Sequence, residues 1–268
     1  MKIFVFGSTG MLGNYITTYL RTKYEVVNVS RLDIDASTTN VGEISSFLSQ
    51  KEISKEDIIV NAIGTIKPRV DELGDLNAIL VNSIFPHYLA KSAENFGVKM
   101  IHITTDCVFT GNKGAYTEED LHDISDVYGR SKSLGEPQNC TIIRTSIIGE
   151  EKNTKRSLIE WIKSNKDKTV FGFTNHLWNG LTCLQVAKVV DEMVQKNIFW
   201  NGVRHVHSPR SLDKQQLVQL VSDVYNLNIT ITPKETELKC DRTLSTIHST
   251  FEIPDLEIQI QEMKNFQL

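Results

Sequence analysis

The sequence lacks any apolar run close to the roughly 20 residues that a helix needs to cross a lipid bilayer. It also lacks an excess of basic residues, because 33 Asp and Glu outweigh 29 Lys and Arg and leave a net charge of −4. Such a balance gives no electrostatic footprint for nucleic acid. The first residues have the apolar pattern of a strand rather than the layout of a signal peptide. The sequence therefore predicts a cytoplasmic protein that binds neither membranes nor nucleic acid.

Cysteine is scarce, and its spacing excludes further classes of protein. The four cysteines include no Cys-x-x-Cys pair and lie far apart, at positions 107, 140, 183 and 240. This pattern fits a reducing compartment and provides no zinc site. His205 and His207 alternate on an expected strand, as metal ligands can, but no third ligand lies near them in the sequence. We therefore expect a structural role for these histidines and no bound metal.

A strand-length apolar run opens the chain and leads directly into three glycines at Gly-x-x-Gly-x-x-Gly spacing. Apolar residues follow at helical spacing, among them Ile16 and Leu20. A strand, a tight glycine turn and a helix in this order let backbone amides approach a pyrophosphate, whose charge the helix dipole favours. An ordinary strand-to-helix turn is the alternative, but the position after the first strand favours dinucleotide binding. The expected contacts are Gly7, Ser8, Thr9, Gly10, Met11, Leu12 and Gly13.

Three residues in the middle of the chain predict proton transfer. Tyr128 and Lys132 lie four residues apart, so both side chains would point into one pocket from a helix. A phenol titrates near ~10, and an ammonium held beside it would lower that pKa. Thr105, at the end of an expected strand, could hold a substrate carbonyl in place. This set suits the transfer of a proton to an oxygen while a hydride reaches its carbon.

Strands and helices alternate along residues 1–150. Besides the opening strand, strands are expected at 25–29, 57–60, 98–104 and 141–144. Helices are expected at about 41–50, 76–96 and 126–136. This alternation predicts an α/β fold with a Rossmann-type doubly wound parallel sheet that is covered on both faces. Ligands bind beyond the carboxyl ends of such strands, where Gly7, Asn61, Thr105 and Arg144 are placed.

Beyond residue 150 the pattern loosens. Helices are expected near 154–165, 182–196 and 211–224. Short strands are expected near 169–171, 203–207 and 228–232. We expect residues 1–150 to form a dinucleotide-binding domain and 151–268 to form mainly a small α/β substrate-binding cap, with some segments returning to the core of the first domain.

The motifs resemble those of the extended short-chain dehydrogenase/reductases, and within them the dTDP-4-dehydrorhamnose reductase family. The resemblance extends over nearly the whole chain. It rests on residues 7–13, Leu32-Asp-Ile-Asp35, Val60-Asn-Ala-Ile63, Val81-Asn82, residues 102–109, residues 128–132 with Gly135-Glu136, Arg144-Thr-Ser146 and residues 241–245. It implies NAD(P)H-dependent reduction of the 4-keto group of a nucleotide-linked 6-deoxyhexose, for deoxysugar and cell-surface polysaccharide biosynthesis. Thr105, Tyr128 and Lys132 would be the catalytic residues.

The end of the second strand indicates which cofactor is used. An acid there would bind both ribose hydroxyls and repel a 2′-phosphate. Here Ser30 and Arg31 follow the strand, and a hydroxyl with a guanidinium suits a phosphate, although a solvated Arg is the alternative. NADPH is therefore expected rather than NADH, with Asp33 and Ile34 beside the adenine, as in the family. The further expected cofactor contacts are Ser30, Arg31, Asp33, Ile34, Asn61, Ala62, Ile63, Gly64, Asn82, Thr104, Tyr128 and Lys132.

The sequence departs from the family at positions that would border the substrate. Cys107 and Ile147 stand where the family usually has aromatic residues, and residues 172–182 replace its usual Asp-Gln-x-Gly-x-Pro segment. The new segment could offer hydrogen bonds and a stacking face to a sugar or base, or it could be a surface loop with a packed Trp. The departures favour a sugar nucleotide related to the family's usual substrate. The expected substrate contacts are Thr65, Asp106, Cys107, Ile147, Asn175, His176, Trp178 and Arg242.

Two other classes of function share these motifs. One is a catalytically silent NADP-binding regulatory subunit, which the intact set of Thr105, Tyr128 and Lys132 argues against. The other is a nucleotide-sugar epimerase or dehydratase, and dehydratases of this fold place an Asp-Glu pair beside the catalytic Thr. Here Asp106 is followed by Cys107, so only half of that pair is present. We therefore expect a reductase, and a homodimer is an expected form of assembly.

Overall fold

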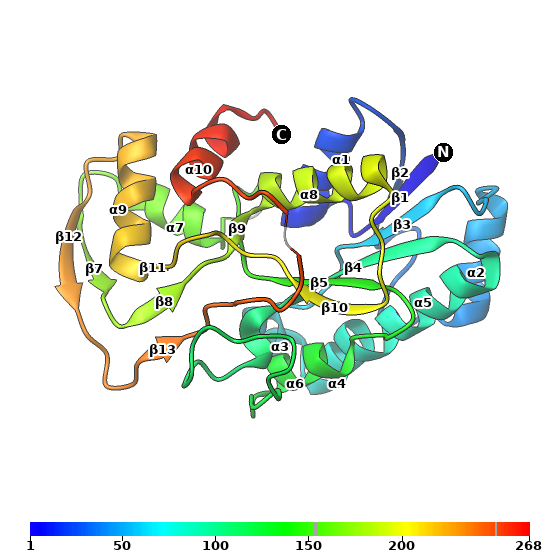
Figure 1. The fold of residues 1–268 in the computed structure, drawn as a ribbon, viewed down its shortest axis with the longest axis horizontal. Coiled ribbons are helices and arrows are strands. Elements are labelled where there is room, and N and C mark those ends of the chain that lie inside the picture. The colour runs from blue at the N-terminus through cyan, green and yellow to red at the C-terminus, as the bar shows by residue number, and fades with distance from the viewer. Residues whose placement is uncertain (153–154, 250) are drawn as a thin grey trace.

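The computed structural model describes residues 1–152, 155–249 and 251–268, and its centre is a six-stranded sheet in which all neighbouring strands are parallel. The strand order is β10-β5-β4-β3-β1-β2, so the chain runs outward from β1 to β2 and returns to the other side of β1. This order confirms the predicted Rossmann-type doubly wound α/β fold (Figure 1). The strands are β1 (Lys2–Phe6), β2 (Glu25–Val29), β3 (Ile58–Asn61), β4 (Lys99–Thr105), β5 (Thr141–Thr145) and β10 (Gly202–His205).

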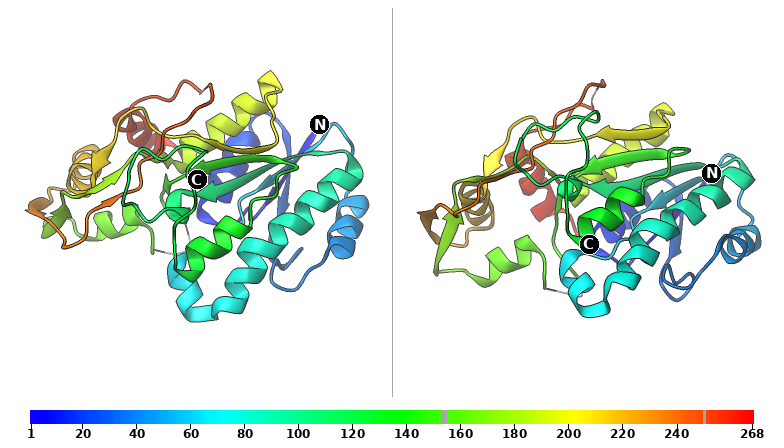
Figure 2. Two further views of the ribbon diagram at one scale, coloured as in Figure 1. Left: turned by 60° about the horizontal axis from the view of Figure 1, so that its bottom comes forward. Right: turned by 90° about the horizontal axis from the view of Figure 1, so that it is seen from below.

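Helices cover both faces of the sheet, and the first strand shows why. Successive side chains of a strand point to opposite faces. Ile3 and Val5 pack with α1 and α8 on one face, whereas Phe4 and Phe6 pack with α2 and α5 on the other. All four side chains are fully buried, as they must be in a parallel sheet covered on both faces. Figure 2 shows helices on either side of the sheet. The helices are α1 (Met11–Leu20), α2 (Val41–Gln50), α5 (Phe85–Phe96) and α8 (Cys183–Lys196).

The helix predicted over 76–96 is present but not regular. It consists of α4 (Asp75–Ala78), a π-helical segment (Ile79–Ile84) and then α5. Pro86 has no N–H to donate to the carbonyl of Asn82 four residues earlier, so the ordinary α-helical ladder cannot continue there. Such π turns are frequent at functional sites, and this one lies against α6 (Val127–Leu134).

Two helices, α6 and α3, border the candidate active site described below. α6 (Val127–Leu134) lies within the predicted span 126–136 and begins where the Asp126 side chain accepts a hydrogen bond from the Gly129 amide. α3 (Lys67–Leu73) was not predicted, because Val70 is its one buried residue and it therefore shows no apolar periodicity.

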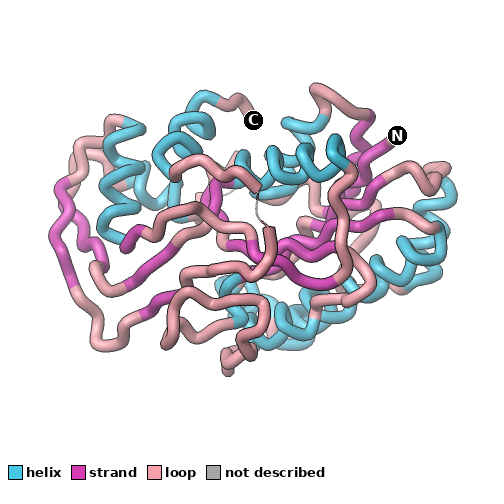
Figure 3. Tube along the Cα trace, in the orientation of Figure 1, coloured by secondary structure: helices cyan, strands magenta, loops and turns pink. Residues whose placement is uncertain are grey.

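Apart from α8 and β10, the chain beyond β5 builds a group of smaller elements beside the central sheet, seen on the left of Figure 3. Parallel pairs join β7 to β12 and β6 to β9, while β8 lies between β11 and β13. The predicted helix 154–165 begins at a residue outside the described part of the chain, and α7 is found from Leu158. The elements are β6 (Ile147–Ile148), α7 (Leu158–Ser164), β7 (Thr169–Phe173), β8 (His176–Trp178), β9 (Leu181–Thr182), β11 (Leu212–Asp213), α9 (Lys214–Tyr225), β12 (Thr230–Lys234), β13 (Cys240–Asp241) and α10 (Leu256–Asn265).

The two halves of the chain share one apolar core. It runs from Ile3 in β1 through Trp178 in β8 and Leu217 in α9 to Met263 in α10. Elements from beyond residue 150 also complete the central sheet, because β10 pairs with β5 and α8 packs on α1. The division into two domains at residue 150 stays a prediction. Among the described residues, no helix combines the length and the apolar character needed to cross a membrane.

Candidate active site

The glycine turn (residues 7–13) joins β1 to α1 and leaves no room for a side chain at Gly7 or Gly13. Gly7 has a φ of +80°, in the left-handed region that favours glycine. A Cβ on Gly13 would lie 2.1 Å from the Gly7 carbonyl oxygen. At the start of α1, Gly10 supplies no side-chain cap, and the first turn carries no acidic residue. The amides of that turn can therefore face an anion, which fits the pyrophosphate of a dinucleotide.

A cleft of about 240 Å³ lies above this turn. The predicted cofactor residues that line it come from the glycine turn, from the loop after β2 and from the loop after β3: Gly7, Thr9, Gly10, Arg31, Ile34, Ala62, Ile63 and Gly64. Thr65, predicted for the substrate, lines it as well. Other lining residues were missed, among them Asp35 and Ser37 after β2 and Arg69 and Leu73 in α3. The two in α3 were missed together with that helix.

Two predicted cofactor residues support the cleft from the interior of the protein. Asn61 accepts a hydrogen bond from the Ile63 amide at 3.0 Å, and its Nδ2 lies 3.0 Å from His102 Nδ1. Asn82, in the π-helical segment, accepts from the Thr65 amide at 2.8 Å and donates to the Thr65 carbonyl at 3.0 Å. Both asparagine side chains are fully buried. They hold the two cleft residues in place and are not themselves exposed to a ligand.

Other predicted cofactor residues are buried or pack against the interior of the protein. Ser8 and Leu12 are buried, and the Ser8 hydroxyl points to the Val29 carbonyl at 3.4 Å. Thr104 is buried, and its hydroxyl has no hydrogen-bond partner within the described residues. Met11 packs at the edge of the main apolar core.

At the end of β2, Asp33 turns back on the strand. Its carboxylate accepts from the Ser30 amide at 2.8 Å and from the Ser30 hydroxyl at 2.7 Å, and these bonds hold its pKa below the usual range. Arg31 is 66% exposed and pairs with Asp35 at 2.9 Å. Arg31 is therefore at the mouth of the cleft, with a guanidinium that a ligand can reach.

The structure places Thr105 and Tyr128 around Cys107. Thr105 ends β4, and its hydroxyl accepts from the Cys107 amide at 3.1 Å. α6 comes so close that a Cβ on Gly129 would lie 2.5 Å from the Cys107 carbonyl oxygen. Lys132, on the same helix, donates to the Ile103 carbonyl at 3.4 Å and lies 3.6 Å from the Cβ position of Gly64, which lines the cleft.

The protonation of this group differs from the prediction. Burial raises the pKa of Tyr128, the charges of Cys107 and Asp106 raise it further, and a hydrogen bond with Thr105 opposes this only in part. Burial lowers the pKa of Lys132 to about 8. The predicted lowering of the phenol pKa is therefore wrong for this structure, because desolvation is the largest influence on the pKa of Tyr128 and raises it. The phenol stays protonated at neutral pH, the state that can donate a proton.

The predicted substrate residues divide into two groups. Asp106 is buried, and burial raises its pKa; burial likewise raises the pKa of Cys107 to about 12. Arg242 reaches the same place from far along the chain and donates from Nη1 to Cys107 Sγ at 3.7 Å. Ile147 lies in β6, paired with Leu181 of β9. The first three thus lie next to Thr105 and Tyr128.

The other group, in and beside β8, does not behave as predicted. Asn175 donates to the Thr236 carbonyl at 2.8 Å, and His176 Nε2 lies 2.8 Å from the Thr236 hydroxyl. Trp178 is 5% exposed and belongs to the apolar core. The side chains predicted to offer hydrogen bonds and a stacking face are instead tied to residue 236 or packed, so the alternative of a packed Trp is the one observed.

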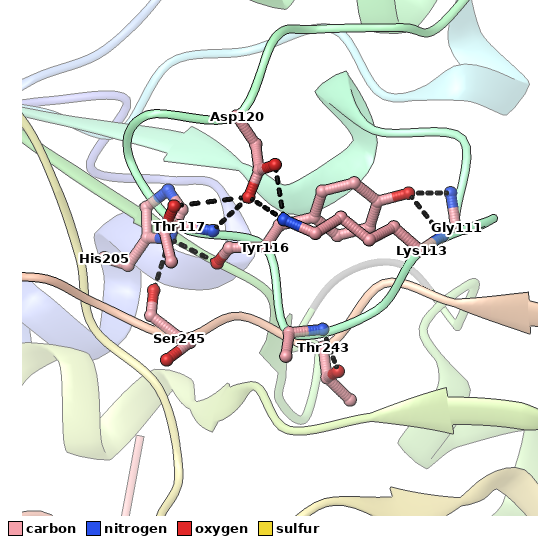
Figure 4. A network of polar contacts seen from close by, with 9 residues as sticks. Gly111, Lys113, Tyr116, Thr117, Asp120, His205, Thr243 and Ser245 are labelled. Carbon is pink, nitrogen blue, oxygen red and sulfur yellow. Dashed lines mark hydrogen bonds and ion pairs between the residues drawn. The ribbon is translucent and has the colours of Figure 1, made fainter.

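A polar network fixes the chain on either side of Arg242, and Figure 4 shows its part around Tyr116 and Thr243. The Tyr116 hydroxyl accepts from the amides of Gly111 and Lys113, which folds the loop after β4 onto itself. The Ala115 amide donates to the Thr243 hydroxyl at 2.8 Å, and the Gly111 carbonyl accepts from the Asp241 amide at 2.7 Å. The segment around residue 242 is therefore fixed on both sides.

Arg144, at the end of β5, is buried and organises a second network. Its guanidinium pairs with Glu136 at 2.6 Å and donates to His205 Nε2 at 2.9 Å and to His122 Nε2 at 2.6 Å. His205 Nδ1 can therefore donate to the Ser245 carbonyl at 2.7 Å, and burial lowers the pKa of His205 to about 4. Of the predicted histidines, His205 thus has a structural role. Within the described residues, no three His, Cys, Asp or Glu side chains form a group that could hold a metal.

Comparison with known proteins places this geometry in a family. Residues 1–253 match the family model described as RmlD substrate binding domain. The dTDP-4-dehydrorhamnose reductase of Aggregatibacter actinomycetemcomitans is 33% identical over 217 residues, 76% of this chain and 71% of that protein. The spore coat polysaccharide biosynthesis protein SpsK of Bacillus subtilis is 32% identical over 156 residues. That match covers 55% of this chain and spans only about half of the relative, 53%.

A solved structure resembles the whole chain. The dTDP-4-dehydrorhamnose reductase of Bacillus anthracis, in complex with NADP, has a TM-score of 0.81 and 16% identity, over 98% of each chain. At this identity the likeness concerns the fold. The fold is that of the extended short-chain dehydrogenase/reductases. This chain belongs to the RmlD substrate binding domain family, the family of the dTDP-4-dehydrorhamnose reductases, as its motifs indicated.

Proposed function

We propose that this protein is an NADPH-dependent reductase of the 4-keto group of a nucleotide-linked 6-deoxy-4-ketohexose, in deoxysugar and cell-surface polysaccharide biosynthesis. The observation that carries the proposal is that the cleft beside the glycine turn lies next to Lys132, one of the predicted catalytic residues. Gly64 lines the same cleft as Gly7 and Gly10, and Lys132 Nζ lies 3.6 Å from its Cβ position. Lys132, one of the three predicted catalytic residues, therefore lies next to the cleft that fits a dinucleotide.

The residues of the cleft suit this cofactor. The first turn of α1 would hold the pyrophosphate, Arg31 the 2′-phosphate, and Lys132 the nicotinamide ribose. When bound, NADPH supplies the hydride for the sugar carbon. Thr105 positions the carbonyl, and Tyr128 donates its phenol proton to the oxygen that gains the charge.

A dehydratase or epimerase is the second candidate, and one observation counts against it. Dehydration on this fold uses an acid and a base next to the catalytic Thr. Cys107 stands at one of these places, and burial raises its pKa to about 12. A thiol that stays protonated at neutral pH cannot act there as a base. The reductase is therefore preferred.

The proposal is tested by following NADPH oxidation with a panel of dTDP-, UDP- and GDP-linked 4-keto-6-deoxy sugars. We expect turnover with at least one member, and with a dTDP sugar first, as in the named reductase relatives. The product should be a hydroxyl at C4, which NMR identifies. If no member of the panel oxidises NADPH above the rate without sugar, the proposal fails.

Replacing Arg31 by Asp should weaken NADPH binding about tenfold or more and NADH binding far less. The change removes a charge-assisted contact and leaves Asp35 without its partner in the cleft, so two carboxylates would repel the 2′-phosphate. Fluorescence titration of both cofactors measures this. The matched control is Arg21→Asp, at an exposed position just after α1. Equal losses for both cofactors would show that Arg31 does not bind the phosphate.

We propose that the protein forms a homodimer and lies in the cytoplasm. Exposed apolar side chains gather on α4, the π-helical segment and α6, where Leu76 is 69%, Ile79 41% and Leu134 68% exposed. These elements are in mutual contact, so a second copy of the chain could cover them together. Light scattering after size-exclusion chromatography would detect the dimer.

The cysteines support the proposed cytoplasmic location. All four are free, as in a reducing compartment.

A further inference from the structure

Two cations from the C-terminal half of the chain lie beside the proposed catalytic residues. One is Arg242, described above. The other is Lys214, the first residue of α9, to which the sequence pattern assigned no role. Its helix begins with a complete capping box between Asp213 and Gln216, so the position of Lys214 is well fixed.

A chain of contacts places Lys214 at the ends of the central strands. Thr145 ends β5 opposite Thr105 of β4. The residue after Thr145 is Ser146, and its carbonyl oxygen would lie 2.3 Å from a Cβ placed on Gly180. Atom Cζ2 of Trp178 would lie 2.3 Å from the same Cβ, so Ser146 and Trp178 are neighbours across Gly180. The Lys214 ammonium lies 5.1 Å from the centre of the Trp178 ring. The buried indole is therefore a platform that holds this cation over the end of the sheet.

The positive charges of Lys214 and Arg242 are not balanced by the carboxylates around them. Lys214 and Arg242 both interact electrostatically with Asp106, a buried carboxylate whose own pKa is raised by burial. Arg242 donates from Nη1 only to the weak acceptor Cys107 Sγ, and its buried Nε has no partner among the described residues. Asp126 also acts on Arg242, but it is already paired with Lys67 at 2.9 Å, so Asp106 is the carboxylate that the two cations share. An unpartnered guanidinium donor next to a second cation is suited to an anion.

We propose that Lys214 and Arg242 together bind the diphosphate of the sugar-nucleotide substrate. The proposal rests on the proposed function, which places the sugar at Thr105 and Tyr128. The diphosphate follows the sugar along the substrate, and it carries the charge that a neutral sugar ring lacks. A planar guanidinium and a flexible ammonium can contact different phosphate oxygens, and the polar network around residues 111–116 keeps Arg242 in position.

The test is a calorimetric titration of the full-length protein, saturated with NADP⁺, with dTDP and with thymidine. Lys214→Met keeps the aliphatic stem over Trp178 and removes only the charge. It should weaken dTDP binding about tenfold or more, within the range of charge-assisted hydrogen bonds. Thymidine binding should stay unchanged, because thymidine has no phosphate. Lys214→Arg should restore most of the dTDP affinity.

The control is Lys188→Met, which removes a lysine paired with Glu262 on α8 and α10 and should leave both titrations unchanged. If wild type binds dTDP and Lys214→Met binds it equally well, the inference is overturned and the proposed function stands. Equal weakening of dTDP and thymidine would also overturn it, since it would mean that Lys214 only supports packing. If wild type binds neither dTDP, UDP nor GDP, the sugar-nucleotide function itself fails.

Discussion

Replacing Tyr128 by Phe is expected to lower turnover by about 10²-fold or more, within the range of general acid catalysis. The ring stays in place, so the packing against Cys107 and the close approach of Gly129 are kept. Only the phenol proton is lost, and no other protonated group in the described site stands one helical turn from Lys132. Steady-state oxidation of NADPH with the best sugar of the panel measures the effect.

NADPH affinity should hardly change in this variant, because the glycine turn and Arg31 are untouched. Tyr88→Phe is the matched control: it removes the same hydroxyl from a half-buried tyrosine of α5, on the far side of the sheet from α1. Wild-type turnover by Tyr128→Phe would contradict the assignment of the proton donor. A large loss of NADPH affinity would mean that the hydroxyl serves binding.

The central fold follows from local patterns in the sequence. Strands such as β1 are apolar throughout because both faces are covered, and this signal locates them to within a residue or two. The π-helical segment depends on Pro86 within an otherwise helical pattern, and α3 has too little buried surface for any periodicity. These irregular elements form one wall of the cleft, so their absence from the prediction removed Arg69 and Leu73 from the expected site.

The site could be predicted where its geometry is local. The glycine turn and the four-residue spacing of Tyr128 and Lys132 depend on neighbours in the sequence, and both are present. Asn175 and His176 were assigned to the ligand because their side chains are polar, but their partner is Thr236, about 60 residues away. Lys214 has no sequence signal, since a lysine at the start of an amphipathic helix is ordinary. Its place depends on the packing of Trp178.

The protonation states of the site residues also could not be predicted from the sequence. Sequence spacing reveals which charges are close, but it does not reveal how far each group is removed from water. Burial is the largest influence on the pKa of Tyr128, Lys132 and Asp106 alike. A reductase that donates a proton benefits from this arrangement, because the phenol keeps its proton until the substrate oxygen gains charge.

Replacing Glu136 by Gln is expected to lower the free energy of unfolding by about 3 kcal/mol, because it leaves the buried guanidinium of Arg144 without a counter-charge. Both side chains of this ion pair are at most 5% exposed, so water cannot compensate. His122 and His205 accept hydrogen bonds from Arg144, but an imidazole is neutral or positively charged and cannot replace the lost negative charge. Urea denaturation followed by circular dichroism gives the free energy.

Arg144 also holds the segment that carries the proposed diphosphate site, because His205, which accepts from Arg144, contacts the Ser245 carbonyl. The destabilised variant should therefore lose dTDP affinity even at temperatures where it is folded. Glu94→Gln is the control: it breaks the exposed ion pair with Lys91 and should change stability by less than about 0.5 kcal/mol. If both variants lose the same small amount, the buried pair adds no more to the fold than a surface one, and the link from Arg144 to the substrate segment would have no energetic basis.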